Sequence, residues 1–196
     1  MTLLQALILG IVQGLTEFLP VSSSGHLVLA NYFLGWGEGL SLSVDIATNT
    51  GTLLAVLIYL RRDVGQALGG FFSGLRSAEA RTGDGWRLGL LVLAGSVPTA
   101  IIGLALSGVF ESLNTPLPVA IALAVTGVIL WFAPKSGPKH TVRQVTFKDA
   151  FIGGVVQGVA VIPGISRSGS TISALLGRGL DKELAPKLSF LMYLVV

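Results

Sequence analysis

The sequence predicts an all-α integral membrane protein built from an inverted repeat of a broken, re-entrant helical hairpin together with transmembrane helices. Three observations lead to this prediction. Hydrophobic residues make up 52% of the 196 residues and charged residues only 12%, and the mean hydropathy of +0.78 is far from that of soluble domains. Several apolar stretches approach the length of a membrane span, and a 22-residue segment occurs twice. We therefore expect the lipid bilayer to be the solvent of this fold.

Three uninterrupted apolar segments are long enough to cross a bilayer. A hydrocarbon core about 30 Å thick requires about 20 apolar residues in a helix, with roughly 17 as the lower limit. The segments at about 44–60, 88–110 and 117–133 meet this requirement, and each is bounded by charged, Gly or Pro residues. We expect three spans, with a kink at Pro98 in the second.

Two further apolar stretches are interrupted and predict re-entrant hairpins. Residues 3–34 are broken at Pro20 and a serine cluster, and residues 150–178 are broken at Pro163-Gly164. The second arm of each is too short to span alone. Non-helical backbone at membrane depth is tolerated only where it is buried in protein or lines a wet cavity, so both breaks are candidate sites. A pair of short turns outside the membrane is the alternative.

The two interrupted stretches are copies of each other. Residues 6–27 align without a gap on residues 150–171 with nine identities, including the Gln-Gly pair and the Ser-x-Ser-Gly run. The constant offset of 144 predicts an internal repeat, with residues 1–144 as the first copy and 145–196 as the start of the second. Because the second copy lacks counterparts of the three spans, we expect a chain truncated at its C-terminus, with residues 187–196 as a partial span.

Topology determines how the two copies are oriented. Three spans separate the hairpins, so the second enters from the opposite face, and inverted repeats place their ligand site where the two halves meet. Basic residues cluster at 61–87 and 135–148, whereas 35–43 and 111–116 carry no Lys or Arg. The positive-inside rule then places the basic loops in the cytoplasm and the first hairpin on the outer side. These clusters are topology signals and give no support to nucleic-acid binding.

The break in the second copy, PGISRSGST, is a predicted phosphate-binding loop. Small residues at a helix start let backbone amides and hydroxyl groups converge on one anion. Arg167 adds a permanent charge that is costly inside a membrane and suits bidentate phosphate binding. Ordinary capping of a helix by Ser and Gly is the alternative. The predicted phosphate-binding residues are Ser166, Arg167, Ser168, Gly169, Ser170 and Thr171, together with Ser22 and Ser24 of the first copy.

The first copy carries an acid before its break. Gln13 and Glu17 stand four residues apart and share one helix face. Glu17 lies deep in apolar sequence. Three roles are open to it: a neutral core acid, a general acid or base, or a carboxylate ligand for Mg²⁺ or Ca²⁺.

The serine loop of the first copy, VSSSGH, ends in a histidine. His26 lies beside the hydroxyl groups of Ser22, Ser23 and Ser24, and it is suited to deprotonate a nucleophile, attack phosphorus or protonate a leaving group. His140 lies in a basic loop, where we expect it to be solvated. One copy thus carries acid–base groups and the other a fixed positive charge, so their apposition predicts one phosphoryl-transfer site.

The segments QGLTEFLPVSSSGH and PGISRSGST resemble the two signature motifs of the undecaprenyl-diphosphate phosphatases, and residues 44–62 and 95–111 also look like that family. The resemblance implies hydrolysis of undecaprenyl diphosphate to undecaprenyl phosphate and inorganic phosphate, which recycles the cell-wall lipid carrier and confers bacitracin resistance. It implies a multi-pass protein of the bacterial cytoplasmic (inner) membrane, with a divalent cation, Mg²⁺ or Ca²⁺, and a site accessible from the periplasmic or outer side. The implied partners are a polyprenyl diphosphate and membrane lipids, with a homodimer as one possible assembly.

The resemblance also assigns roles. Gln13 and Glu17 occupy the [E/Q]xxxE motif as a tentative metal pair, which the amide of Gln13 weakens, and the other matching positions are Ser22, Ser23, His26, Ser166, Arg167 and Thr171. We expect Arg167 and the loop amides to hold the diphosphate, Glu17 to stabilise developing charge, and Ser23, His26 or water to attack. A secondary transporter or lipid-phosphate flippase is the main alternative, and a purely structural bundle is another.

Overall fold

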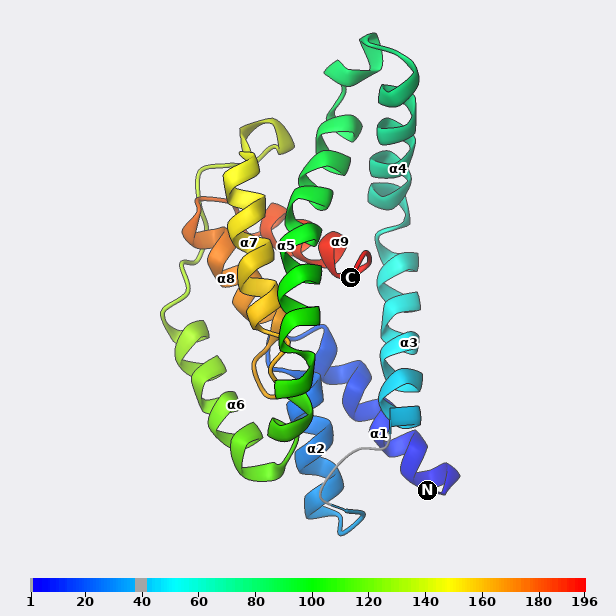
Figure 1. Ribbon diagram of the computed structural model, residues 1–196, viewed down its shortest axis with the longest axis vertical. Coiled ribbons are helices and arrows are strands. Elements are labelled where there is room, and N and C mark those ends of the chain that lie inside the picture. Colours follow the sequence, from blue (N-terminus) through cyan, green and yellow to red (C-terminus); the bar gives the residue numbers. More distant parts are fainter. Residues whose placement is uncertain (1, 38–41) are drawn as a thin grey trace.

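The computed structural model describes residues 2–37 and 42–196, and within these ranges it consists of helices and their connections. The predicted all-α class is confirmed. The elements in chain order are α1 (Leu3–Glu17), α2 (Ser23–Phe33), α3 (Leu42–Tyr59), α4 (Arg61–Arg76), the 3₁₀ turn η1 (Glu79–Thr82), α5 (Asp84–Leu113), α6 (Pro116–Trp131), η2 (Val142–Gln144), α7 (Phe147–Val159), α8 (Arg167–Gly177) and α9 (Leu184–Tyr193) (Figure 1).

The two interrupted stretches form helix pairs with matching boundaries. Thr2 caps the N-terminus of α1, and Thr146 caps that of α7. Each of these threonines forms a capping box. After the breaks, α2 begins at Ser23 and α8 at Arg167, and both are 11 residues long. All of these positions differ by the same 144 residues. The second pair starts three residues before the expected position 150, and α7 ends at Val159, two residues before the position equivalent to the end of α1 at Glu17.

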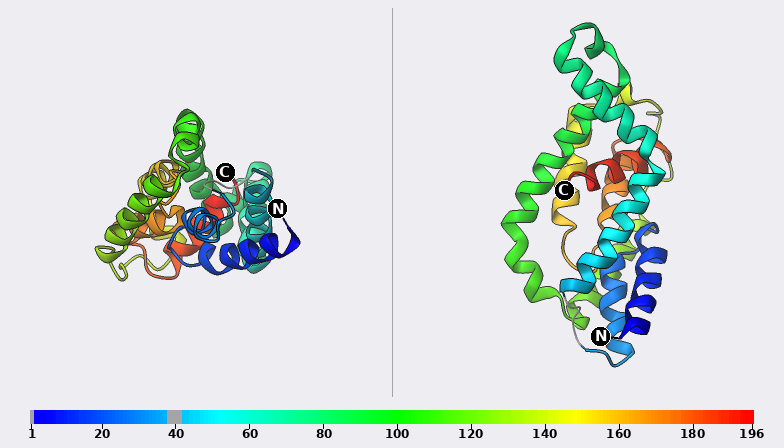
Figure 2. Two further views of the ribbon diagram at one scale, coloured as in Figure 1. Left: turned by 90° about the horizontal axis from the view of Figure 1, so that it is seen from below. Right: turned by 90° about the vertical axis from the view of Figure 1, so that its right-hand side faces the viewer.

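The two pairs run from opposite ends of an elongated molecule, and their breaks lie close together near its middle (Figures 1 and 2). The α4–α5 connection and the start of α7 lie towards one end, and the start of α6 lies at the other. The first of these ends carries the basic segments. This is the arrangement expected for an inverted repeat with basic residues on the cytoplasmic side.

The predicted spans fall in α3, α5 and α6. Residues Asp84–Gly108 of α5 are long and apolar enough to cross a membrane, and α5 continues as one helix through Pro98. Helices α3 and α4 meet the same criterion only if they are counted together as one span, and they are bent by 76° at their junction. The apolar helix α6 has 16 residues. Large hydrophobic side chains are exposed along α1, α3, α5 and α6, as is expected for faces in contact with lipid.

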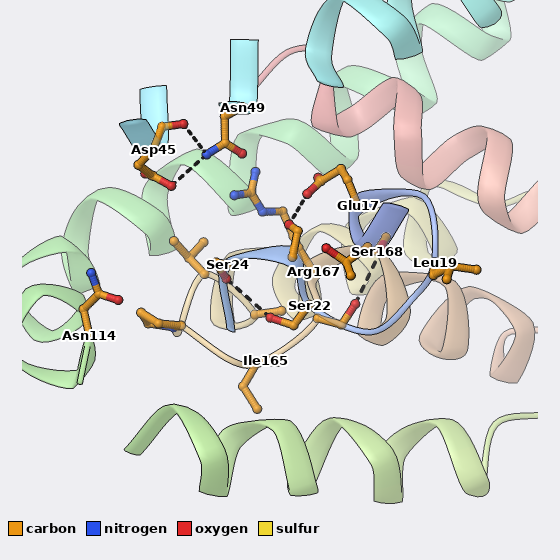
Figure 3. Close-up of a pocket in the computed structure, with 16 residues that line it drawn as sticks. Glu17, Leu19, Ser22, Ser24, Asp45, Asn49, Asn114, Ile165, Arg167 and Ser168 are labelled. Atoms are coloured by element: carbon orange, nitrogen blue, oxygen red, sulfur yellow. Dashed lines mark hydrogen bonds between the residues drawn. The ribbon is translucent and has the colours of Figure 1, made fainter. Parts of the chain in front are cut away.

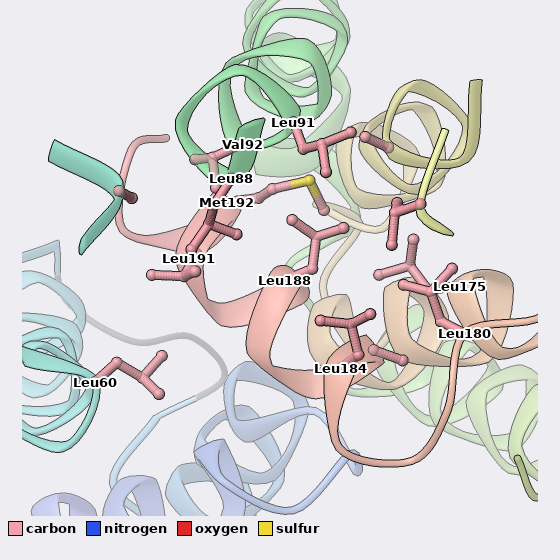
Figure 4. Packing of buried hydrophobic residues seen from close by; sticks show 14 of the residues in the cluster. Leu60, Leu88, Leu91, Val92, Leu175, Leu180, Leu184, Leu188, Leu191 and Met192 are labelled. Carbon is pink, nitrogen blue, oxygen red and sulfur yellow. The ribbon is translucent and has the colours of Figure 1, made fainter. Parts of the chain in front are cut away.

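The largest hydrophobic core surrounds α9, where the sequence predicts a partial span. Leu188 and Met192 of α9 are fully buried against Leu91 of α5 and Leu175 of α8 (Figure 4). This core connects α8, and therefore the second serine loop, to the long helix α5 through α9.

The first helices of the two copies, α1 and α7, differ in how closely their glycines pack against other helices. Gly154 and Gly158 of α7 lie against α5, and a Cβ on Gly154 would overlap with the carbonyl oxygen of Gly95. Their counterparts in α1, Gly10 and Gly14, have no neighbouring atom within 4 Å of the same position. They line an apolar groove of about 490 Å³ between α1 and α3. The close approach of α5 and α7 thus depends on glycine, whereas the same face of α1 is open in this chain.

Candidate active site

Both serine loops line one cavity of about 460 Å³ (Figure 3). Side chains from α3 and residues of the connection between α5 and α6 complete its wall. Seven of the predicted site residues line the cavity: Glu17, Ser22, Ser23, Ser24, Ser166, Arg167 and Ser168.

Two equivalent glycines allow the loops to approach each other. A Cβ on Gly25 would lie 3.0 Å from the Cα of Gly164, and a Cβ on Gly169 would lie 2.7 Å from the carbonyl oxygen of Pro20. Pro20 and Gly164 are themselves 144 residues apart, so the contact is reciprocal. A side chain at either glycine would push the loops apart. The repeated Ser-x-Ser-Gly run therefore also holds the two halves of the cavity together.

A threonine of α6 supports the turn before the second loop. The Thr126 hydroxyl donates to the carbonyl oxygen of Gly164 at 2.9 Å and accepts a hydrogen bond from the Ser166 amide at 2.9 Å. Gly164 has φ +92°, a conformation that favours glycine. Thr126 was not predicted from the sequence, because its role depends on the packing of α6 against this turn.

Glu17 is paired with a serine of the neighbouring loop. The Ser23 hydroxyl donates to Glu17 Oε2, and Gln13 Nε2 donates to the same oxygen at 3.1 Å. Gln13 is buried behind the cavity and is also held by Asn49 Oδ1 at 3.3 Å and by Thr52 Oγ1 at 3.4 Å. A carboxylate that accepts a hydroxyl proton is placed to act as a general base. Gln13 directs its amide nitrogen towards Glu17. In this orientation Gln13 positions the carboxylate of Glu17 and does not offer a second oxygen ligand to a metal ion.

His26 lies next to the cavity but does not line it. Its Nδ1 is 2.8 Å from the carbonyl oxygen of Ser22, a hydrogen bond that fixes the ring. Ser22 has φ +66°, which is unusual for a residue other than glycine. The hydroxyl of Ser22 also caps α2 by accepting from the Gly25 amide at 3.4 Å. The other histidine, His140, is exposed and bonds to Asp181 Oδ2 at 2.8 Å.

The second loop presents the start of α8 to the cavity. Ser166 caps the helix by accepting from the Gly169 amide at 3.0 Å, and the amides of the first two helical residues, Arg167 and Ser168, have no partner within the helix. The guanidinium lies over the Tyr193 ring at 5.0 Å and points towards the wall formed by Asn49 and Glu17 (Figure 3). In the described part of the chain, no carboxylate forms an ion pair with Arg167. This cation and the helix N-terminus are suited to bind an anion.

Three predicted phosphate-binding residues do not reach the cavity. Gly169 is buried in the contact between the loops, and the Thr171 hydroxyl donates to the carbonyl oxygen of Arg167 at 2.8 Å. Ser170 is buried, and its hydroxyl has no hydrogen-bond partner. The helical turn directs these residues away from the face that Ser166, Arg167 and Ser168 present.

The structure adds four polar residues that were not predicted from the sequence to belong to the site: Thr16, Asp45, Asn49 and Asn114. Asn49 Nδ2 donates to Asp45 Oδ1 at 2.9 Å, one turn apart on α3 (Figure 3). An acidic residue inside a predicted span is a functional signal by itself, so Asp45 was detectable. Asn114 lies in a connecting loop, and its place depends on the tertiary fold.

The implied divalent cation fits the side chains of this cavity. The described residues contain no group of three His, Cys, Asp or Glu side chains suited to hold a metal ion. Glu17 and Asp45 nevertheless line the same cavity. Mg²⁺ commonly binds one or two carboxylates together with substrate phosphates. These two acids would therefore be the protein ligands, and the cation itself remains a proposal.

The fold and this cavity define a class: a helical membrane protein whose acid–serine pair faces an arginine at a helix N-terminus, an arrangement suited to phosphoryl transfer. Residues 6–196 match the family model described as bacitracin resistance protein BacA. The undecaprenyl-diphosphatase of Acaryochloris marina is 68% identical over all of this chain and 74% of its own length. The enzyme of the same name from Alkaliphilus metalliredigens is 45% identical over 98% of this chain and 72% of its own. The chain belongs to the bacitracin resistance protein BacA family.

Proposed function

We propose that this chain is a membrane phosphatase that hydrolyses undecaprenyl diphosphate to undecaprenyl phosphate and inorganic phosphate, and so recycles the cell-wall lipid carrier. Membership of the family and the names of its relatives support this activity. The observation that carries the proposal is the pairing of Ser23 with Glu17 in the cavity that Arg167 also lines. A transporter would need to bind phosphate, but it has no use for an activated hydroxyl.

Ser23 is the nucleophile that the geometry favours. Its hydroxyl gives its proton to Glu17 as Oγ attacks the terminal phosphorus. The bond from that phosphorus to the bridging oxygen breaks, and undecaprenyl phosphate leaves. Glu17 passes the proton from Ser23 to solvent and is again a carboxylate. It then takes a proton from the water that attacks the phosphoserine, and it returns this proton to Ser23 Oγ as the serine–phosphorus bond breaks and inorganic phosphate leaves. His26 is less suited to attack because it does not line the cavity.

Arg167 and the amides at the start of α8 bind the phosphate oxygens and stabilise the charge that develops as the bond breaks. Ser166 and Ser168 supply further hydroxyl groups at this wall. A Mg²⁺ or Ca²⁺ ion held by Glu17 and Asp45 would supply additional charge neutralisation when bound.

We further propose that the protein lies in the bacterial cytoplasmic membrane and that the site opens to the outer side. Asn114, which lines the cavity, belongs to the connection between α5 and α6. That connection carries no Lys or Arg. An opening near the end that lacks basic residues agrees with the positive-inside rule.

Trapping of the phosphorylated enzyme tests the mechanism. Purified protein is incubated with undecaprenyl diphosphate labelled in its terminal phosphate, denatured in detergent at neutral pH, where phosphoserine and phosphohistidine both survive, and mapped by mass spectrometry. We expect label on Ser23, and Ser23→Ala should lower kcat by about 10³-fold or more. The control Ser107→Ala, at an exposed serine of α5 that does not line the cavity, should keep most of the activity. Label on His26 would refute the role of Ser23, active protein without any label would favour direct attack by water, and absence of phosphate release would refute the proposed function.

A further inference from the structure

Gln157 is the counterpart of Gln13 in the second copy, and the proposed mechanism does not use it. Both glutamines are 1% exposed and occupy the same position in their helices. Gln13 Nε2 has partners, including Glu17, whereas Gln157 Nε2 is buried without any hydrogen-bond partner in the described chain. A buried donor left unpaired is costly, so its presence calls for a partner that is not a protein group.

A small cavity next to this amide supplies the space for such a partner. Its volume of about 10 Å³ is at the lower limit at which a cavity can hold one water molecule. Gln157 lines it together with polar side chains from the site and from α9, namely Glu17, Arg167, Ser168, Ser189 and Tyr193. A buried water needs two to four polar partners, and this lining provides them.

We propose that Gln157 is a positioning residue of the active site, and that its Nε2 binds one buried water molecule that in turn donates a hydrogen bond to the Glu17 carboxylate. The acid is then held from both copies of the repeat. Gln13 binds Glu17 directly from α1, and Gln157 binds it through water from α7. This arrangement fixes the carboxylate towards Ser23, and it rests on the proposed phosphatase function of the same site.

The test compares Gln157→Met, which keeps the length of the side chain but removes its donor, with Gln157→Asn, which keeps an amide. Ser96→Ala is the matched control, since the Ser96 hydroxyl is also buried without a partner but lines neither cavity. We expect Gln157→Met to lower kcat for undecaprenyl diphosphate about tenfold, with KM changed less than twofold and Tm not lowered. Gln157→Asn should recover part of the loss, and Ser96→Ala should resemble the wild type.

A second readout does not depend on turnover. The infrared carboxylate band that is lost in Glu17→Gln should shift in Gln157→Met and stay in place in Ser96→Ala. A wild-type kcat in Gln157→Met, an unshifted Glu17 band, or a parallel fall of kcat and Tm that Asn does not relieve would each overturn the proposal. If the wild-type protein releases no phosphate but the Glu17 band still shifts in Gln157→Met, the phosphatase function is refuted and the water site is supported.

Discussion

Replacing Gly169 by Ala should separate the two serine loops and slow the reaction. The added Cβ would lie 2.7 Å from the carbonyl oxygen of Pro20, and ordinary contact begins at 3.4 Å. The loops must therefore move apart by about 0.7 Å, because this nearest atom is backbone. Ser166 must shift as well, since its Oγ and Cβ would lie 2.9 and 3.0 Å from the added Cβ. A misplacement approaching 1 Å can cost about 10²-fold in rate. We expect kcat for phosphate release to fall about 10- to 100-fold.

The assay measures phosphate release from undecaprenyl diphosphate by purified variants in detergent, with Tm recorded for each. Gly177→Ala is the matched control, because it lies on the same helix and an added Cβ meets nothing within 4 Å. Gly25→Ala should give a smaller loss than Gly169→Ala, since its Cβ would lie at 3.0 Å and part of its contact is with the flexible Leu123 side chain. A Gly169→Ala enzyme as active as Gly177→Ala would refute the argument that the glycine contact sets the geometry of the site.

Two further predictions concern stability. Gly154→Ala should lower the unfolding free energy of the 196-residue chain by about 1–3 kcal/mol, because the added Cβ overlaps with Gly95. Gly10→Ala should leave the unfolding free energy unchanged or raise it by up to about 1 kcal/mol, because Ala favours the helix more than Gly does. Equal changes in the two variants would contradict the difference in packing between α7 and α1. Burial raises the pKa of Asp149, just outside the predicted hairpin 150–178, but hydrogen bonds from Lys139, Thr146 and Arg178 outweigh that effect and lower the pKa to about 2. The pKa of Asp149 in the folded chain is below its unfolded value of 3.8. The ionised carboxylate therefore adds about 2 kcal/mol to the unfolding free energy above pH 4, and this contribution is lost as the pH falls through 2. Unfolding measured from pH 5 to 2 should therefore show a smaller loss of stability in Asp149→Asn than in the wild type.

The sequence by itself determined the class of fold, the break in each hairpin and three central residues of the site. Apolar length and composition follow directly from the thickness and chemistry of a bilayer, so they can be read without a structure. The offset of 144 between the two copies also required no coordinates. From these local properties followed the prediction that Glu17, Ser23 and Arg167 belong to one site, and all three line one cavity.

Only the tertiary structure decided which atoms face that cavity. Thr171 and Ser170 share a motif with Arg167, but the turn of α8 directs them elsewhere. Asn114 and Gln157 are near the site because helices distant in the sequence pack together. A motif specifies residue types along a helix, whereas hydrogen-bond partners and unfilled space depend on how several helices meet. The pairing of Ser23 with Glu17 and the water-sized cavity beside Gln157 could therefore emerge only from the folded chain.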